Sequence, residues 1–274
     1  MSDILEEIVA HKRVEIELQK ELLAPTLLYQ QVEQLLFEQP SVSPTTSMRQ
    51  TLLSSSTGII AEFKRKSPSK GWIKEGGKAS EIPLSYQQNG ASAVSILTDE
   101  MFFGGKDAFI EEARSSGVSI PILYKNFIVD EYQLFQARRC GASTVLLIAS
   151  VLSLKECRSL MSIAHEIGLE VLMEMHAEQE LDYVALEPDM CGINNRHLGT
   201  FVTDVQNSFR LAAKLPDGIC KVSESGISNP LTIRDLRAAG FRGFLIGETL
   251  MKEDHPGDAL AMLIQQVENN PIII

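Results

Sequence analysis

Short apolar runs alternate with amphipathic stretches from Ile59 to the end of the chain. Eight of these runs are rich in Val, Ile, Leu and Met, which is typical of strands buried on both faces. They cover residues 59–63, 93–98, 121–125, 144–149, 170–175, 190–194, 219–223 and 243–247. The runs recur at roughly 20 to 35 residues, the length that a strand with its connecting helix needs. We therefore expect parallel strands joined by helices.

The segments between the runs carry helical patterns. The clearest lie at 130–142, 153–170 and 229–240. The last of them has start and stop signals, because Asn229 can cap the first turn, Pro230 suits the first helical position and Gly240 favours an end. The sequence thus predicts a helix after most strands.

Eight strands alternating with helices in about 215 residues fit a (β/α)8 barrel. A doubly wound sheet is the alternative, but it usually carries a glycine-rich turn after its first strand, and KRKSPSKG (64–71) stands there instead. Ahead of the barrel, Ile4, Leu5, Ile8, Val9, Ile16 and Leu18 mark an amphipathic helix, VEQLLFEQ (32–39) suggests a second, and PSVSPTTS (40–47) reads as a connection. We expect one domain over residues 1–274, with a helical extension at 1–48 and the barrel at 49–274.

The charge and the cysteines limit the classes of partner. The formal net charge is −11, which argues against nucleic acid. Four cysteines stand singly, without the spacing of a zinc or redox site, so we expect reduced thiols. The N-terminal residues are acidic where a signal peptide would be apolar, and no apolar stretch has the length of a membrane span. These features predict a cytoplasmic protein that binds neither nucleic acid nor membrane.

One basic stretch, AEFKRKSPSKG (61–71), stands out against this acidic background, because it holds four cations and one carboxylate. It begins inside the first predicted strand. Glu62 and Lys64 share one side of that strand with Ile60, whereas Ala61 and Phe63 face the other way, toward the helices. A solvated basic loop is one interpretation, and a mouth for an anionic substrate is the other.

Polar residues also end the later strands, where barrel enzymes carry their catalytic groups. They are Lys125, Glu174, Asn194, Arg196, Glu224, Ser225, Gly226, Gly247 and Glu248. Charges that point into a barrel are costly without a partner or a ligand, so the set favours a site for a charged molecule. The small residues of SESGI (223–227) and LIGETL (245–250) suit a phosphate, which Lys64 and Ser67 could also meet. The histidines lack metal-ligand spacing and no nucleotide fingerprint is visible, so we expect neither a metal nor a cofactor.

Five motifs in order resemble the indole-3-glycerol phosphate synthase family: AEFKRKSPSKG, ILYKNFIVDEYQ, GINNRHLGTF, VSESGI and LIGETLM. The resemblance extends from ILEEIVAHKRVEIE to the last helix. It implies a phosphorylated small molecule as substrate, 1-(2-carboxyphenylamino)-1-deoxyribulose 5-phosphate. The implied reaction closes the pyrrole ring and releases carbon dioxide and water, with no cofactor.

The resemblance also implies roles for matched residues. Lys125 would protonate the ketone oxygen, Glu174 would stabilise charge in the ring, and Glu62 and Lys64 would share the loss of water with Lys125. The remaining matches would bind the substrate, with the carboxylate at Arg196 and the phosphate near the last two strands. These are Ser67, Asn194, Arg196, Glu224, Ser225, Gly226, Gly247 and Glu248. Candidates for an apolar wall around the ring are Phe103, Phe127 and Leu147.

Two residues depart from the family pattern, because Asn126 and His197 stand where aspartate is usual. They are expected to affect the rate rather than the reaction. The alternatives are a related barrel enzyme, such as phosphoribosylanthranilate isomerase or a Schiff-base aldolase using Lys125, and a barrel that binds without catalysis. We expect a monomer or a weak homodimer.

Overall fold

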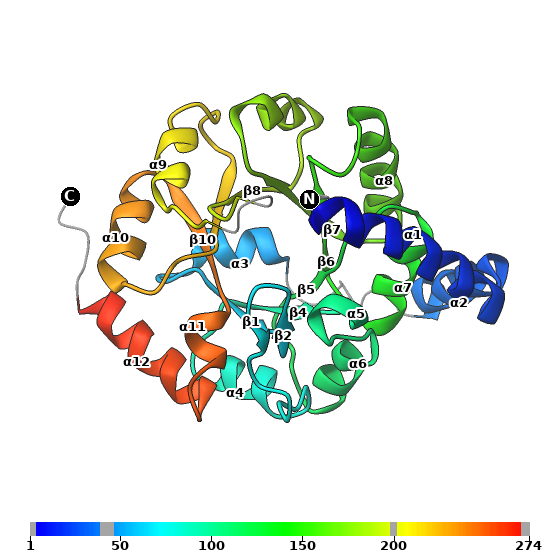
Figure 1. Cartoon of the computed structure of the whole chain (residues 1–274), viewed down its shortest axis with the longest axis horizontal. Coiled ribbons are helices and arrows are strands. Elements are labelled where there is room, and N and C mark those ends of the chain that lie inside the picture. Colours follow the sequence, from blue (N-terminus) through cyan, green and yellow to red (C-terminus); the bar gives the residue numbers. More distant parts are fainter. Residues whose placement is uncertain (1–3, 39–46, 198–201, 270–274) are drawn as a thin grey trace.

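A computed structural model describes residues 4–38, 47–197 and 202–269. Eight parallel strands close into a barrel in the order β1-β10-β9-β8-β7-β6-β5-β4 (Figure 1). They are β1 Ile59–Phe63, β4 Ala93–Leu97, β5 Ile122–Lys125, β6 Thr144–Ile148, β7 Glu170–Met175, β8 Met190–Asn194, β9 Cys220–Glu224 and β10 Phe241–Ile246. Each predicted strand is present, with ends within two residues of those expected, so the barrel prediction is confirmed.

Helices surround this barrel and follow its strands in turn (Figure 1). Those after β1 are α4 Ile82–Gln88, α5 Glu100–Phe103, α6 Ala108–Ser115, α7 Tyr132–Cys140, α8 Leu154–Glu166, the 3-10 helix η1 Glu178–Leu186, α9 Gln206–Ala212, α10 Pro230–Ala238, α11 Glu248–Met251 and α12 Pro256–Glu268. The predicted cap of α10 is confirmed, since Asn229 Oδ1 accepts a hydrogen bond from the Leu231 amide at 2.9 Å.

The strands separate an inner from an outer apolar layer. The inner side chains include Ile60, Leu123, Leu172 and Val222, and they fill the barrel. Ala61 and Phe63 belong to the outer layer under the helices, as predicted. A short helix, α3 Met48–Ser54, adds Met48 and Leu52 to the inner layer. The barrel is thus filled with side chains below its carboxyl end.

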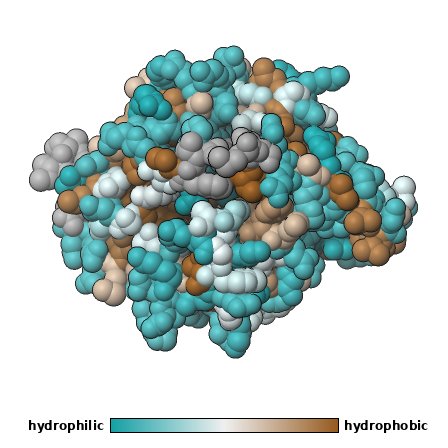
Figure 2. All heavy atoms as spheres, viewed as in Figure 1, coloured by the Kyte–Doolittle hydropathy of each residue, from teal (hydrophilic) through white to brown (hydrophobic). Residues whose placement is uncertain are grey.

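Two helices precede the barrel, α1 Ile4–Leu22 and α2 Pro25–Glu38. Their existence is confirmed, but the predicted apolar face of α1 was wrong at Leu18, which is 56% exposed. The buried face is made by Leu5, Ile8, Lys12 and Ile16 instead. In Figure 1 the two helices lie side by side next to α7, and in Figure 2 hydrophobic residues gather over them. Most of the predicted connection at 40–47 lies outside the described residues.

Candidate active site

A cavity of about 640 Å³ opens at the carboxyl end of the barrel. It is lined by the strand-end residues singled out in the sequence, with one exception. The lining members of that set are Glu62, Lys64, Lys125, Glu174, Asn194, Arg196, Glu224, Ser225, Gly226, Gly247 and Glu248. The barrel topology brings them together because parallel strands end on the same side. The exception, Ser67, is buried beside the cavity, and its hydroxyl has no hydrogen-bond partner among the described residues.

Lys125 lies at the centre of the charged groups. Its Nζ is 2.9 Å from Glu174 Oε2 and 2.8 Å from Glu224 Oε2. A second pair stands across the cavity, where Lys64 Nζ is 2.5 Å from Glu62 Oε1. The three carboxylates are almost fully buried. The cavity therefore holds two ammonium groups, each within hydrogen-bond distance of a carboxylate.

Two glycines leave room for these carboxylates. A Cβ added to Gly192 would overlap Glu224 Oε1, and one added to Gly247 would overlap Glu62 Oε1. Gly192 lies in β8, beside the strand that carries Glu224. The carboxylates thus fill space that any other residue at these positions would occupy.

The two carboxylates on Lys125 differ in their affinity for protons. Burial and the charge of Glu174 raise the pKa of Glu224 to about 7, against the opposing effect of Lys125. Burial also acts to raise the pKa of Glu174, but Lys125 and His176 hold it well below its usual range. Although burial opposes the charge of Lys125, Glu174 and Glu224 keep its pKa above the usual value. Near neutral pH, Glu224 can exchange a proton while Glu174 stays ionised.

The predicted phosphate region has an unusual backbone. Ser225 has a φ of 68° and Gly226 one of 73°, so the chain turns sharply after β9. Arg196 and Lys70 approach Glu248 from two sides, with nitrogen–oxygen distances of 3.8 Å each. These distances are too long for hydrogen bonds, which leaves both cations able to bind an anion.

The basic stretch folds into a small hairpin that the sequence did not predict. Strand β2 (Lys66–Ser67) pairs antiparallel with β3 (Gly71–Trp72). The Arg65 guanidinium lies 5.3 Å from the Trp72 ring centroid, and Lys66 Nζ donates to the Met101 carbonyl at 2.9 Å. Of the four cations, Lys64 and Lys70 line the cavity. The stretch therefore serves both interpretations, with two cations at the cavity and two that hold the hairpin.

The apolar wall contains Phe103 and Phe127, whose ring centroids are 5.9 Å apart. Leu147 was a wrong prediction, because it faces the outer layer under the helices. Its neighbours Leu146 and Ile148 face the cavity, as the alternation along β6 requires. The helix α1 adds Ile4, Leu5 and Ile8 to the wall, a contribution with no signal in the strand pattern.

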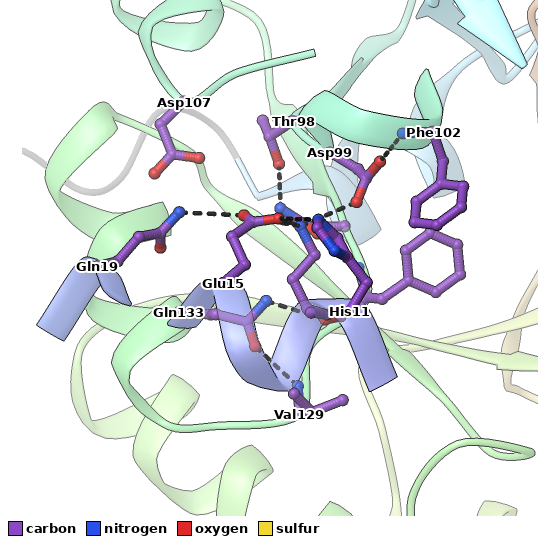
Figure 3. A network of polar contacts seen from close by, with 12 residues as sticks. His11, Glu15, Gln19, Thr98, Asp99, Phe102, Asp107, Val129 and Gln133 are labelled. Carbon is purple, nitrogen blue, oxygen red and sulfur yellow. Dashed lines mark hydrogen bonds and ion pairs between the residues drawn. The ribbon is translucent and has the colours of Figure 1, made fainter. Parts of the chain in front are cut away.

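A buried ion pair holds α1 against this wall. Lys12 Nζ lies 2.9 Å from Asp99 Oδ2, and both side chains are at most 1% exposed. Asp99 Oδ1 also accepts from the Phe102 amide and so caps α5 (Figure 3). The His11 ring packs edge-on against Phe102, with centroids 5.7 Å apart. The same carboxylate therefore fixes α1 and the helix that carries Phe103.

Of the two departures from the family pattern, one is buried and one is exposed. Asn126 Nδ2 donates to Thr98 Oγ1 at 2.8 Å and to the Tyr124 hydroxyl at 3.3 Å, while its Oδ1 accepts from the Phe127 amide. The Asn126 side chain thus both donates and accepts hydrogen bonds, whereas an ionised carboxylate could only accept them. His197 is exposed, and its backbone amide donates to the Val202 carbonyl.

His176 lies next to the site although it was not among the predicted residues. Its Nε2 lies 3.2 Å from Glu174 Oε1, on the side away from Lys125. A signal was available, because residues two apart at a strand end lie on the same side.

Within the described residues, no cluster of His, Cys, Asp and Glu could hold a metal ion. No helix in this part of the chain is long and apolar enough to cross a membrane.

Comparisons with known proteins agree on one family. The family model described as indole-3-glycerol phosphate synthase matches residues 5–263. A protein of that name from Bacteroides thetaiotaomicron is 53% identical, and the alignment covers 98% of this chain and 100% of the relative. Another, from Magnetococcus marinus, is 41% identical, covering 96% of this chain and 98% of the relative.

Solved structures share the fold at low sequence identity. One is 3-hexulose-6-phosphate synthase from Salmonella typhimurium, with a TM-score of 0.60 at 14% identity, covering 77% of this chain and 99% of the other. Another is tryptophan synthase subunit alpha from Legionella pneumophila, with a TM-score of 0.60 at 13% identity, covering 81% and 98%. At these identities the likeness concerns the barrel alone.

Proposed function

The chain belongs to the indole-3-glycerol phosphate synthase family, and from that membership we propose how the cavity performs the reaction. The family's activity is that of a carboxy-lyase. It converts 1-(2-carboxyphenylamino)-1-deoxyribulose 5-phosphate to indole-3-glycerol phosphate, carbon dioxide and water. The position of the Lys125 ammonium between Glu174 and Glu224, beside the Phe103–Phe127 wall, is the observation on which the assignment of roles rests.

The substrate lies with its aromatic ring on the apolar wall and its phosphate at the turns after β9 and β10. Ser225, Gly226 and Gly247 offer backbone amides there, and Lys70, which was not among the predicted site residues, adds positive charge. Arg196 binds the ring carboxylate through its planar guanidinium. The ketone between ring and phosphate then reaches the centre of the cavity, where Lys125 lies.

In the first step the ring carbon that carries the carboxylate forms a bond to the ketone carbon. The ketone oxygen takes a proton from Lys125 Nζ, and Glu174 stabilises the positive charge that develops in the ring. The bond to the carboxylate then breaks, carbon dioxide leaves, and its electron pair restores the aromatic ring. This order needs a charged Lys125 and an ionised Glu174, which matches the directions of their pKa values.

The second step removes water. The new hydroxyl leaves with a proton from an ammonium group, and a carboxylate takes a proton from the neighbouring methylene carbon. The Lys64–Glu62 pair supplies both groups at 2.5 Å from each other. Lys125 shares the acid role once Glu224, 2.8 Å from its Nζ, has returned a proton to it. The products are then indole-3-glycerol phosphate, carbon dioxide and water.

The rival activities have weaker support. A Schiff-base aldolase needs a neutral amine, whereas the two carboxylates on Lys125 favour its ammonium form. A sugar isomerase has no use for the second Lys–Glu pair. A barrel that only binds would not require three buried carboxylates, whose burial costs stability.

The decisive test is to mix the purified protein with the carboxyphenylamino-deoxyribulose phosphate and follow indole fluorescence. We expect a rise that saturates with substrate. Binding without a rise would overturn the proposed roles and favour a binding barrel. Borohydride added with substrate distinguishes the aldolase, since only that enzyme would leave a covalent adduct on Lys125.

We further propose that the chain works in the cytoplasm, as a monomer or a weak homodimer. The four cysteines are buried free thiols, a state that a reducing compartment maintains. Analytical ultracentrifugation across a range of protein concentrations tests the oligomeric state. A stable assembly of more than two copies would contradict it.

A further inference from the structure

His176 lies directly behind the catalytic carboxylate Glu174 without lining the cavity itself. It follows the end of β7, and its side chain is 11% exposed. Its Nε2 faces Glu174 Oε1, whereas Lys125 holds the other oxygen, Oε2. The Glu174 carboxylate is thus held between two cationic groups, one on the cavity side and one behind.

A second carboxylate, that of Glu180, lies near the other nitrogen of the imidazole. Glu180 is in η1, and its Oε2 lies 3.8 Å from His176 Nδ1. The same oxygen accepts a hydrogen bond from the His176 backbone amide at 2.5 Å. The His176 carbonyl accepts from Asn207 Nδ2 at 3.0 Å, and the same group donates to the Asn194 carbonyl. The His176 backbone is therefore fixed by hydrogen bonds on both sides, and this places the ring between the Glu174 and Glu180 carboxylates.

The count of charges explains what this arrangement does. Lys125 alone would serve two carboxylates, Glu174 and Glu224, and one ammonium cannot keep both ionised in a buried site. The imidazolium adds a second cation, which lies beside Glu174 and, of the two carboxylates on Lys125, pairs with that one alone. It thereby decides which carboxylate stays charged and leaves Glu224 as the one that exchanges protons.

We propose that His176 is a positioning residue for the reaction, whose imidazolium, placed between Glu174 and Glu180, keeps the Glu174 carboxylate charged and aimed at Lys125. This inference rests on the proposed role of Glu174. Burial disfavours the charged ring, but Glu174 and Glu180 outweigh it and raise the pKa of His176 to about 9. The charged groups around the ring are Glu174 of β7 and Glu180 of η1, with Lys125 of β5 and Glu224 of β9 beyond Glu174, and Arg210 of α9 bound to Asn207.

Two variants and one matched control test the proposal. His176→Gln removes the cation, and Glu180→Gln weakens its support without touching the cavity. Glu178→Gln is the control, because Glu178 lies in the same helix but pairs with Lys214 at the surface. Circular dichroism and urea unfolding show that each variant is folded. The readouts are kcat, KM, the pH profile of kcat, and the titration of the His176 imidazole by NMR, assigned by its loss in His176→Gln.

We expect His176→Gln to lower kcat by about 100-fold with little change in KM, as misplacing a catalytic group by about 1 Å does. In the wild type and in Glu178→Gln, the imidazole and the basic limb of kcat should titrate together near pH 9. Glu180→Gln should move both toward acid by about one unit. His176→Gln should lack that limb.

Three results would overturn the proposal. They are an imidazole that titrates at its ordinary pH, a Glu180→Gln variant whose imidazole shifts while its pH profile does not, and a folded His176→Gln with wild-type kcat. Failure of the proposed function is a separate result, namely a wild-type protein that binds substrate without forming indole. In that case the imidazole titration still decides whether His176 is a cation held by the two carboxylates.

Discussion

Gly192 and Glu224 share one space in the barrel, because a Cβ on Gly192 would overlap Glu224 Oε1. Gly192→Ala should therefore push the carboxylate away from Lys125 while the strand survives. We expect kcat to fall by about 100-fold, the usual effect of displacing a catalytic group by about 1 Å. The matched control is Gly76→Ala, where an added Cβ meets nothing within 4 Å. Equal activity in the two variants would show that the Glu224 position is unimportant.

Replacing Lys125 tests the assignment of the acid. Lys125→Ala removes the proton donor, so turnover should fall by at least about 1,000-fold, within the range for general acid catalysis. Folding should be retained, which the far-ultraviolet circular dichroism spectrum checks. If the variant kept most of its activity, the acid would have to be another residue.

The pKa of Glu224 predicts how stability depends on pH. Because burial and Glu174 raise this pKa to about 7 from 4.5, the folded state binds the proton more tightly than the unfolded state. The contribution to stability is full below pH 4.5 and is lost as the pH rises through 7. Glu224→Gln has no carboxyl to titrate at this position. Between pH 4.5 and pH 8 the unfolding free energy of the wild type should therefore fall by about 3 kcal/mol more than that of the variant. Urea unfolding at both pH values measures the difference, and parallel curves would refute it.

Asn126 offers a test of the departure from the family pattern. In Asn126→Asp a carboxylate would face the Tyr124 hydroxyl, which already donates to Asp107 Oδ1 at 2.8 Å. We expect a loss of about 2 kcal/mol in unfolding free energy, because a buried hydrogen-bond partner is removed.

The double variant Asn126→Asp, Asp107→Asn should recover most of that loss. An amide at position 107 can donate to Tyr124, whose hydroxyl then donates to the carboxylate introduced at position 126. Urea unfolding of the two single variants and the double variant completes the cycle. Additive losses would mean that Tyr124 does not connect the two positions.

The buried Lys12–Asp99 pair predicts a link between the N-terminal helix and the barrel. Lys12→Met leaves the buried Asp99 side chain without its cationic partner, which should cost about 3 to 5 kcal/mol. If residues 1–274 form one domain, unfolding should remain a single transition. Lys20→Met is the control, since its pair with Asp130 is partly exposed and worth at most about 1 kcal/mol. Similar losses in both variants would contradict the assigned importance of Lys12.

The barrel could be predicted because the local sequence of each strand indicates a buried strand. In TVLLI at β6 every residue after Thr144 is apolar, and the run follows a helix-ending glycine, Gly141, which indicates where it begins. The strand-end residues followed from the same regularity, because all parallel strands end on one side. Even the error at Leu147 was one residue in register, which exchanges the two faces of a strand.

What could not be predicted depends on contacts between distant segments. Lys12 looks like a surface residue of an amphipathic helix until Asp99 is brought against it. His176 showed no metal-ligand spacing, and its role became visible only through Glu174 and Glu180. The need for glycine at positions 192 and 247 could not be predicted either, because the carboxylate that lies against each of them comes from a neighbouring strand.

The anchoring of α1 has a consequence for the order of events during synthesis. The Tyr132 hydroxyl donates to the Gln19 carbonyl across 113 residues of sequence, and the Asp99 carboxylate pairs with Lys12 across 87. The ribosome therefore delivers α1 well before the surface on which it docks. Until β4, α5 and α7 have emerged from the ribosome, the apolar face of α1 stays exposed, and a chaperone can bind it. Helix α1 therefore docks only after the chain has been made as far as Cys140, the end of α7.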